Sequence, residues 1–166
     1  ELWLTDNQAN IFRFADYGWQ QIDGKATDIA IGDDGSVYSI GTTECGSGFG
    51  IYRFVEPNGW EQLPGCATKI DISPEGVPWV VNRRGKIFKL EDGDWQQMPG
   101  SAVDIVLGER GQAWAVGTSP CHGGRRLYHF SGDGWSEMDG CAVALDVSNS
   151  AIWVVNSMGE IYREHR

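Results

Sequence analysis

One phrase recurs at nearly equal intervals along this chain of 166 residues, and it constrains the fold more than any other feature. Four near-copies begin at intervals of 41, 35 and 40 residues, at Trp19, Trp60, Trp95 and Trp135. They read WQQIDGKATDIAIG, WEQLPGCATKIDIS, WQQMPGSAVDIVLG and WSEMDGCAVALDVS. A repeat of this length predicts an array of small units that bury their apolar faces against one another.

Each copy predicts four short β-strands. The apolar segments are rich in β-branched and aromatic side chains, and Asp-Gly, Pro-Gly and Asn-Gly turns separate them. Four antiparallel strands repeated at this spacing are typical of a β-propeller blade. The sequence therefore predicts one all-β propeller domain over residues 1–166, with a blade tail over 1–18 and repeats beginning at 19, 60, 95 and 135. These four repeats make four complete four-stranded blades, with partial-blade strands at the termini.

The predicted strands do not close a ring. Three strands precede Ala26, four belong to each of the next three blades, and three form the last blade, which makes 18. The N-terminal piece supplies the second to fourth strands of a blade, and the C-terminal piece supplies the first to third. We expect an open arc, a fragment of a larger ring, or self-association at the exposed edges near residues 2–5 and 160–163.

The four cysteines follow an alternation of long and short blades. Cys45 and Cys121 lie in the long loops GTTECGSGFG and GTSPCHGGRR, whereas Cys66 and Cys141 open the short blades. In a propeller, the loop between the second and third strands lies on the same face as the connection to the next blade. This placement predicts the disulfides Cys45–Cys66 and Cys121–Cys141, each contributing about 3 kcal/mol.

Metal binding is the other use of four cysteines, but it requires converging ligands, and the two pairs lie two blades apart. We therefore expect disulfides and no metal site. Paired disulfides in turn indicate an oxidising, extracellular compartment, so the sequence predicts a secreted protein.

Charge and hydropathy exclude several classes of partner. The chain carries 13 basic and 23 acidic residues, a net charge of −10, which argues against nucleic acid because phosphate binding needs a basic surface. No apolar run approaches the roughly 18 residues of a membrane helix, so we expect no membrane insertion. None of the three histidines lies near a Ser or Cys in a nucleophile motif, which favours a non-catalytic protein.

Four carboxylates lie on the strands predicted to line the central channel: Asp28, Asp71, Asp104 and Asp146. They could hold a cation such as Ca²⁺, or they could accept hydrogen bonds from water and backbone N–H groups. Asp28 and Asp104 stand two positions before the register of the other two, so the four do not form one uniform ring. We favour the second role and expect no cofactor, with Ca²⁺ as a weak alternative.

The segments WEQLPGCATKIDISPEGVPWVVNRRGKIFKL and AWAVGT…RLYHFSGDGW resemble the tectonin repeat, and the resemblance covers essentially the whole chain. It implies a propeller, usually of six blades, that binds glycans or lipopolysaccharide (LPS) on microbial or egg surfaces. Tectonins, fish-egg lectins and the tachylectin-type LPS-binding lectins of innate immunity are its members. Tectonin repeats also occur in intracellular scaffolds, so a structural or protein-binding propeller without a sugar site is the alternative.

A sugar site needs an aromatic face for the apolar side of the ring and polar groups for its hydroxyls. Second-strand tryptophans, the asparagines that close those strands and polar residues of a long loop supply both. The candidate ligand-binding residues are therefore Trp79, Asn82, Trp114, Thr118, His122, Arg125, Trp153 and Asn156. The alternative roles are packing between blades for the tryptophans and turn formation for the asparagines.

These sites are expected between blades, on the face that carries the long loops. A shallow site should bind in the millimolar range, about −4 kcal/mol, and several equal sites would raise avidity on a glycan-coated surface. The net charge favours neutral sugars over anionic ones, unless Arg83, Arg84, Arg125 and Arg126 gather on one face.

Overall fold

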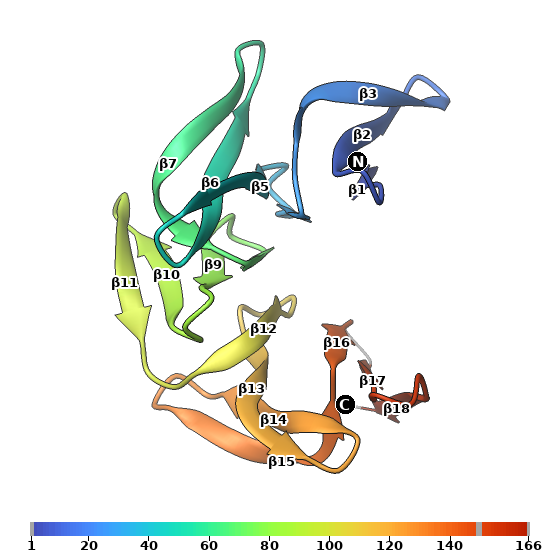
Figure 1. The fold of residues 1–166 in the computed structure, drawn as a ribbon, viewed down its shortest axis with the longest axis vertical. Helices are drawn as coiled ribbons and strands as arrows, with labels where there is room; N and C mark the ends of the chain where they lie inside the picture. Colours follow the sequence, from blue (N-terminus) through green and yellow to red (C-terminus); the bar gives the residue numbers. More distant parts are fainter. Residues whose placement is uncertain (1, 149–150, 166) are drawn as a thin grey trace.

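The computed structural model describes residues 2–148 and 151–165, which form 18 β-strands and no helix. The strands make five antiparallel sheets that are arranged around a common centre as an open arc (Figure 1). The described residues contain no helix that could cross a membrane. The all-β propeller fold and the count of 18 strands confirm the prediction from sequence.

We number the sheets as blades one to five. Blade one contains β1 (Leu2–Thr5), β2 (Asn10–Ala15) and β3 (Gly18–Lys25). Blade two contains β4 (Asp28–Ile31), β5 (Val37–Cys45), β6 (Gly48–Val55) and β7 (Gly59–Ala67). Blade three contains β8 (Lys69–Ile72), β9 (Pro78–Val81), β10 (Ile87–Glu91) and β11 (Asp94–Met98). Blade four contains β12 (Ala102–Leu107), β13 (Ala113–Cys121), β14 (Gly124–Phe130) and β15 (Trp135–Ala142), and blade five contains β16 (Ala144–Val147), β17 (Ala151–Val155) and β18 (Ile161–His165).

Sequence repeats and blades are offset by one strand. Each of the four repeats contains four strands, but its first strand pairs with the preceding blade, as Trp60 of β7 pairs with Phe54 of β6. The repeats are therefore spread over three four-stranded and two three-stranded sheets among the described residues. The expected four complete four-stranded blades are thus three, because the first strand of each repeat belongs to the blade before it. Within residues 2–148 and 151–165, blade one has no counterpart of β4 and blade five has no counterpart of β7, and the arc is open between them (Figure 1).

The core lies between the blades. Ile40 and Ile51 of blade two pack with Ile70 and Val80 of blade three in one buried cluster, and comparable clusters fill the other interfaces. Alternate residues of each short strand face one neighbouring blade, which explains the β-branched and aromatic composition of the repeats.

The repeated tryptophans tie the outer strands of neighbouring blades together. The indole N–H groups of Trp60, Trp95 and Trp135 donate to the carbonyl oxygens of Asp23, Pro64 and Pro99, at 2.7–2.8 Å. The residue after each acceptor is a glycine with positive φ, and a Cβ on Gly100 would lie 2.8 Å from Cδ1 of Trp135. The Pro-Gly and Asp-Gly turns therefore serve to bring the backbone close to the indole.

The inner strands are linked through their carboxylates. Asp28 accepts a hydrogen bond from the backbone N–H of Ile70, and Asp71 accepts one from Leu107, in each case on the next blade. Desolvation raises the pKa of Asp28, and it raises the pKa values of Asp71 and Asp104 to about 6. Among the described residues, no group of three or more His, Cys, Asp or Glu side chains is placed to hold a metal ion.

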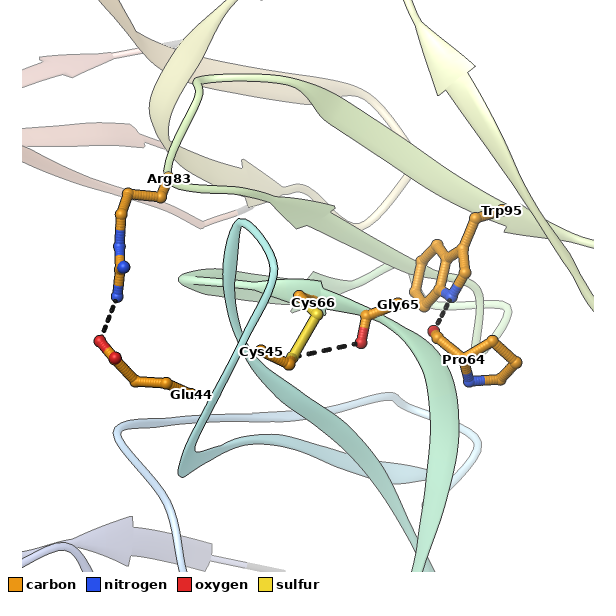
Figure 2. Close-up of a disulfide and its surroundings, with 7 residues drawn as sticks. All are labelled: Glu44, Cys45, Pro64, Gly65, Cys66, Arg83 and Trp95. Atoms are coloured by element: carbon orange, nitrogen blue, oxygen red, sulfur yellow. Dashed lines mark hydrogen bonds and ion pairs between the residues drawn. A yellow bond between two sulfur atoms is a disulfide. The ribbon is translucent and has the colours of Figure 1, made fainter.

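Both predicted disulfides are present. Cys45 is bonded to Cys66, and Cys121 is bonded to Cys141, with Cα atoms 5.9 and 6.0 Å apart. Figure 2 shows the first bridge, which joins the end of β5 to the end of β7. We call the face that carries these bridges and the long loops the long-loop face, and the other the opposite face. The disulfides fix each long loop to the strand that leads into the next blade.

Candidate functional site

Two equivalent pockets open on the long-loop face between blades. The 1/2 pocket, between blades one and two, has a volume of about 280 Å³ and is lined by Ile11, Gly24, Lys25, Ser39, Gly41, Thr42, Thr43, Tyr52 and Trp60. The 3/4 pocket, between blades three and four, has a volume of about 220 Å³ and is lined by Ile87, Gly100, Ser101, Ala115, Thr118, Ser119, Tyr128 and Trp135. The repeat therefore places the same kind of hollow at two interfaces.

Each of these pockets combines two aromatic rings with adjacent hydroxyl groups. Tyr52 and Trp60 correspond to Tyr128 and Trp135, and all four rings are half-buried. A glycine at the end of each second-strand core segment makes room for the tyrosine, because a Cβ on Gly41 would lie 2.7 Å from Cε2 of Tyr52. No carboxylate lines either pocket.

The long loops cover the other two interfaces. The backbone N–H of Arg83 donates to the carbonyl of Ser47 at 2.6 Å, and that of Ser157 donates to Gly123 at 2.8 Å. The ion pair between Arg83 and Glu44, at 2.9 Å, lies beside the first contact (Figure 2). Each long loop thus overhangs the interface and reaches the turn of the next blade.

Beneath these overhangs lie the 2/3 and 4/5 pockets, of about 290 and 430 Å³. Asn82 lines the former, and His122 and Asn156 line the latter. The 4/5 pocket has no counterpart of Trp95, because blade five has three strands. Its lining is mostly apolar and includes Met138 and Met158.

The structure buries two of the predicted tryptophans between blades. Trp79 is 5% exposed and packs edge-on against Phe130, and Trp114 is 3% exposed with its ring 4.9 Å from that of His129. These rings lie in the interfaces between blades, so neither offers a face for a sugar. Trp153, on blade five, is 42% exposed and has the Arg163 guanidinium 5.2 Å from its ring centre.

The two predicted asparagines shape turns. Oδ1 of Asn82 accepts the backbone N–H groups of Arg84 and Lys86, and Oδ1 of Asn156 accepts those of Met158 and Glu160. Asn82 lines the 2/3 pocket and Asn156 lines the 4/5 pocket. Their Oδ1 atoms, however, are used for hydrogen bonds within their own turns.

The long-loop residues are divided between pockets. Thr118 lines the 3/4 pocket, and Nη1 of Arg125 donates to its carbonyl oxygen at 2.5 Å. His122 lies one interface further on, at the 4/5 pocket. The sequence analysis missed Tyr52 and Tyr128 as lining residues, although their spacing of 76 residues on the two long blades was a usable signal.

A hollow of about 690 Å³, larger than the four pockets described above, lies on the opposite face between blades one and two. Its lining includes Asp33, Trp3 and the ion pair between Arg13 and Glu56, at 2.7 Å. This hollow is not one of the repeated pairs described above.

Comparison with known proteins agrees with this architecture. A family model for the Tectonin domain matches residues 46–123. No curated protein matches the chain in sequence. The fold is similar to that of YCF48 bound to D1 peptide, with a TM-score of 0.63 and 15% identity over 98% of this chain and 60% of that chain.

Two further solved structures share the fold. One is a putative gluconolactonase, with a TM-score of 0.63 and 13% identity over 95% of this chain and 67% of that one. The other is a luciferin-regenerating enzyme, with a TM-score of 0.62 and 9% identity over 94% of this chain and 71% of that one. At these identities the likeness concerns the fold alone. The chain spans 60% of the length of the YCF48 chain. Residues 46–123 thus match the Tectonin domain, and the repeat they contain recurs along the whole chain and forms the blades of the β-propeller.

Proposed function

We propose that this chain is a secreted, non-catalytic lectin that binds glycans through the 1/2 and 3/4 pockets. The observation that carries the proposal is the twofold occurrence of one pocket, with a tyrosine, a tryptophan and neighbouring hydroxyl groups each time. A pyranose presents an apolar face and a rim of hydroxyls, which these two kinds of group complement.

The lining of these pockets supports binding without catalysis. Neither lining contains a histidine, a cysteine or a carboxylate, the groups that most often serve in acid–base and nucleophilic catalysis. The two disulfides support an extracellular location. By resemblance to the lectins of the family, the ligand is a glycan or LPS on a microbial or egg surface.

Each pocket is small and open to solvent, so we expect dissociation constants in the millimolar range, about −4 kcal/mol. The two pockets open on the same face, so one molecule can engage two sugars of the same surface. Such double binding raises the apparent affinity well above that of one pocket.

NMR titration tests the proposal with a reporter in each pocket. The indole N–H signals of Trp60 and Trp135 should shift when methyl glycosides or LPS fragments are added, whereas that of Trp95, at the 2/3 pocket, should not. Thr42→Val and Thr118→Val should each weaken binding at their own pocket only, which makes each variant the control for the other.

A protein-binding scaffold is the second candidate. It is favoured by one observation: the exposed large apolar side chains of the described residues gather on blades one and five and the strand connections next to them. If no sugar or LPS fragment at tens of millimolar moves either indole signal, and a protein partner binds instead, the scaffold replaces the lectin.

A further inference from the structure

The two equivalent pockets differ in one charge. Lys25 lines the 1/2 pocket, and the corresponding residue of the 3/4 pocket is Ser101. The residues around this position are similar in the two, with Gly24 matched by Gly100 and Thr42 by Thr118. One interface thus presents an ammonium group where the other presents a hydroxyl.

The ammonium of Lys25 is held at the rim of its pocket by neutral acceptors. Its Nζ donates to Oδ1 of Asn10 at 2.6 Å and to the carbonyl of Gln8 at 3.1 Å. An ammonium has three N–H donors, so these two bonds leave one for a ligand, and they do not neutralise the charge. The nearby carboxylate of Asp6 accepts hydrogen bonds from the backbone N–H groups of Gln8 and Asn10 and from the Asn10 amide. The pKa of Asp6 is lowered chiefly by the hydrogen bond from the Asn10 side chain, and the charge of Lys25 also contributes to lowering it, so this carboxylate offsets part of the charge of Lys25 without a direct ion pair.

The 3/4 pocket has cations near it but none in its lining. Nη1 of Arg125 is committed to the Thr118 carbonyl, and Lys86 takes the place of Asn10 in the repeat, on the strand connection beside the pocket. Ser101 therefore leaves this pocket without a charge of its own.

The long-loop face, on which the 1/2 pocket opens, is also less acidic than the opposite face. The strand connections of the opposite face carry eight carboxylates and one arginine among the described residues: Asp16, Asp33, Asp34, Glu56, Glu75, Asp92, Glu109 and Asp133 against Arg110. Those of the long-loop face carry two carboxylates and three basic residues: Asp6 and Glu160 against Arg83, Arg84 and Lys86. An anionic ligand is thus repelled less at the long-loop face than the net charge of the chain implies.

We infer that the 1/2 pocket selects sugars with an anionic substituent, a carboxylate or a phosphate ester, and that Lys25 determines this specificity. The 3/4 pocket takes neutral sugars. This inference rests on the proposed lectin function, and it gives the two pockets of one molecule different ligands. It also replaces the sequence-based expectation of neutral sugars at one of the two sites.

A matched pair of sugars tests the inference. Methyl β-glucuronide and methyl β-glucoside differ only at the C6 carboxylate, and the Trp60 and Trp135 indole signals report each pocket separately. At pH 7 and low salt, the glucuronide should bind the 1/2 pocket about 2- to 5-fold more tightly than the glucoside, which is the range of one exposed ion pair. Added salt should reduce this ratio, and the 3/4 pocket should show no preference.

Reciprocal variants move the charge. Lys25→Ser should abolish the preference at the Trp60 signal, Lys25→Arg should keep it, and Ser101→Lys should create one at the Trp135 signal. Methyl glucoside 6-phosphate serves as a second probe; a larger ratio than for the glucuronide would identify a phosphate as the better anion.

Equal binding of the charged and neutral sugars at the 1/2 pocket would overturn the inference, as would a preference that survives Lys25→Ser. Ser101→Lys keeps the test open if Lys25→Ser does not fold, since a folded variant without a new preference is also a contradiction. If both pockets bind the glucoside and neither prefers the glucuronide, the inference about Lys25 is wrong but the lectin proposal stands. Loss of all sugar binding instead sinks the lectin proposal itself.

Discussion

Single side chains set the contact between neighbouring blades. Trp60, Trp95 and Trp135 each fill the gap between two outer strands and use their one polar atom on a turn carbonyl of the blade before. Trp19 belongs to the same series but lies on blade one, where it is 49% exposed and packs against Phe14. Trp19 can therefore serve as a control for the tryptophans that join two blades.

Trp95→Phe should lower the free energy of unfolding by about 1–2 kcal/mol, because it removes the N–H and leaves the Pro64 carbonyl without this donor. Trp19→Phe is the matched control and should change the stability by less than about 0.5 kcal/mol. Urea unfolding of both variants checks this. Equal losses would show that the hydrogen bond to the turn does not matter for stability.

The carboxylates of the inner strands make stability depend on pH. Desolvation raises the pKa of Asp104 to about 6, above the value of about 4 expected in the unfolded chain, so the folded state binds the proton more tightly. This contribution is present in full below pH 4 and is lost as the pH rises through 6. The buried carboxylate therefore favours the folded state in mild acid.

Asp104→Asn should flatten the dependence of unfolding free energy on pH between 4 and 7 and should stabilise the protein at pH 7.5 by on the order of 1–2 kcal/mol. Asp133→Asn, in an exposed turn, controls for the change in net charge. The measurement is chemical denaturation at several pH values. A variant that keeps the wild-type slope would assign the pH dependence to other groups.

At the scale of elements, the long loops depend on the disulfides for their position. Each bridge holds the end of a second strand against the end of an outer strand, and the loop then bonds to the next blade through Ser47 or Gly123. The cost of ordering such a loop is paid partly by the bridge, which limits the freedom of the unfolded chain.

The double variant Cys45→Ser/Cys66→Ser should lose about 3 kcal/mol of stability, since it opens a loop of about 20 residues. Amide exchange should rise around Ser47 and Arg83, whose hydrogen bond depends on the loop. The equivalent change at Cys121 and Cys141 leaves the first loop intact and is its control. Unchanged exchange at Arg83 would contradict the role of the bridge.

Much of this architecture could be predicted from sequence, because residues at the same position of each repeat occupy equivalent positions in successive blades. Repetition gave the pairing of Cys45 with Cys66, since the face of a loop follows from the order of strands. It did not separate Trp79, which is buried, from Trp60, which lines a pocket, because both are strand tryptophans at a blade interface. The depth of a residue along that interface depends on packing, which the repeat pattern does not encode.

The whole molecule is an arc with two unmatched ends (Figure 1). Its exposed large apolar side chains lie at those ends: Leu2, Leu4, Phe14, Tyr17, Trp19, Val143, Trp153, Met158, Ile161 and Tyr162. Unpaired strand edges with apolar side chains favour association with other chains. The middle of the arc, by contrast, buries such side chains between blades.

We therefore expect the chain to associate at high concentration. Leu4→Lys and Ile161→Lys should reduce this association, because a charged residue on an edge opposes strand pairing. Gln62→Lys, on an exposed strand of blade two, adds the same charge and should have little effect. Sedimentation velocity across a range of concentrations measures the difference, and a monomer at all concentrations would refute the expectation.

The offset between repeats and blades has a consequence for how such a protein evolves. Residues 19–59 belong to two sheets, yet they supply Gly24 and Lys25 from one wall of the 1/2 pocket and Thr42 and Tyr52 from the other. A segment that is duplicated or exchanged along the gene at the tryptophans thus carries most of one pocket lining, although it carries no intact sheet. If these pockets bind sugars as we propose, recombination at those points would exchange their ligand preferences as units, and exchange of residues 19–59 with 95–134 would transfer the preference of one pocket to the other.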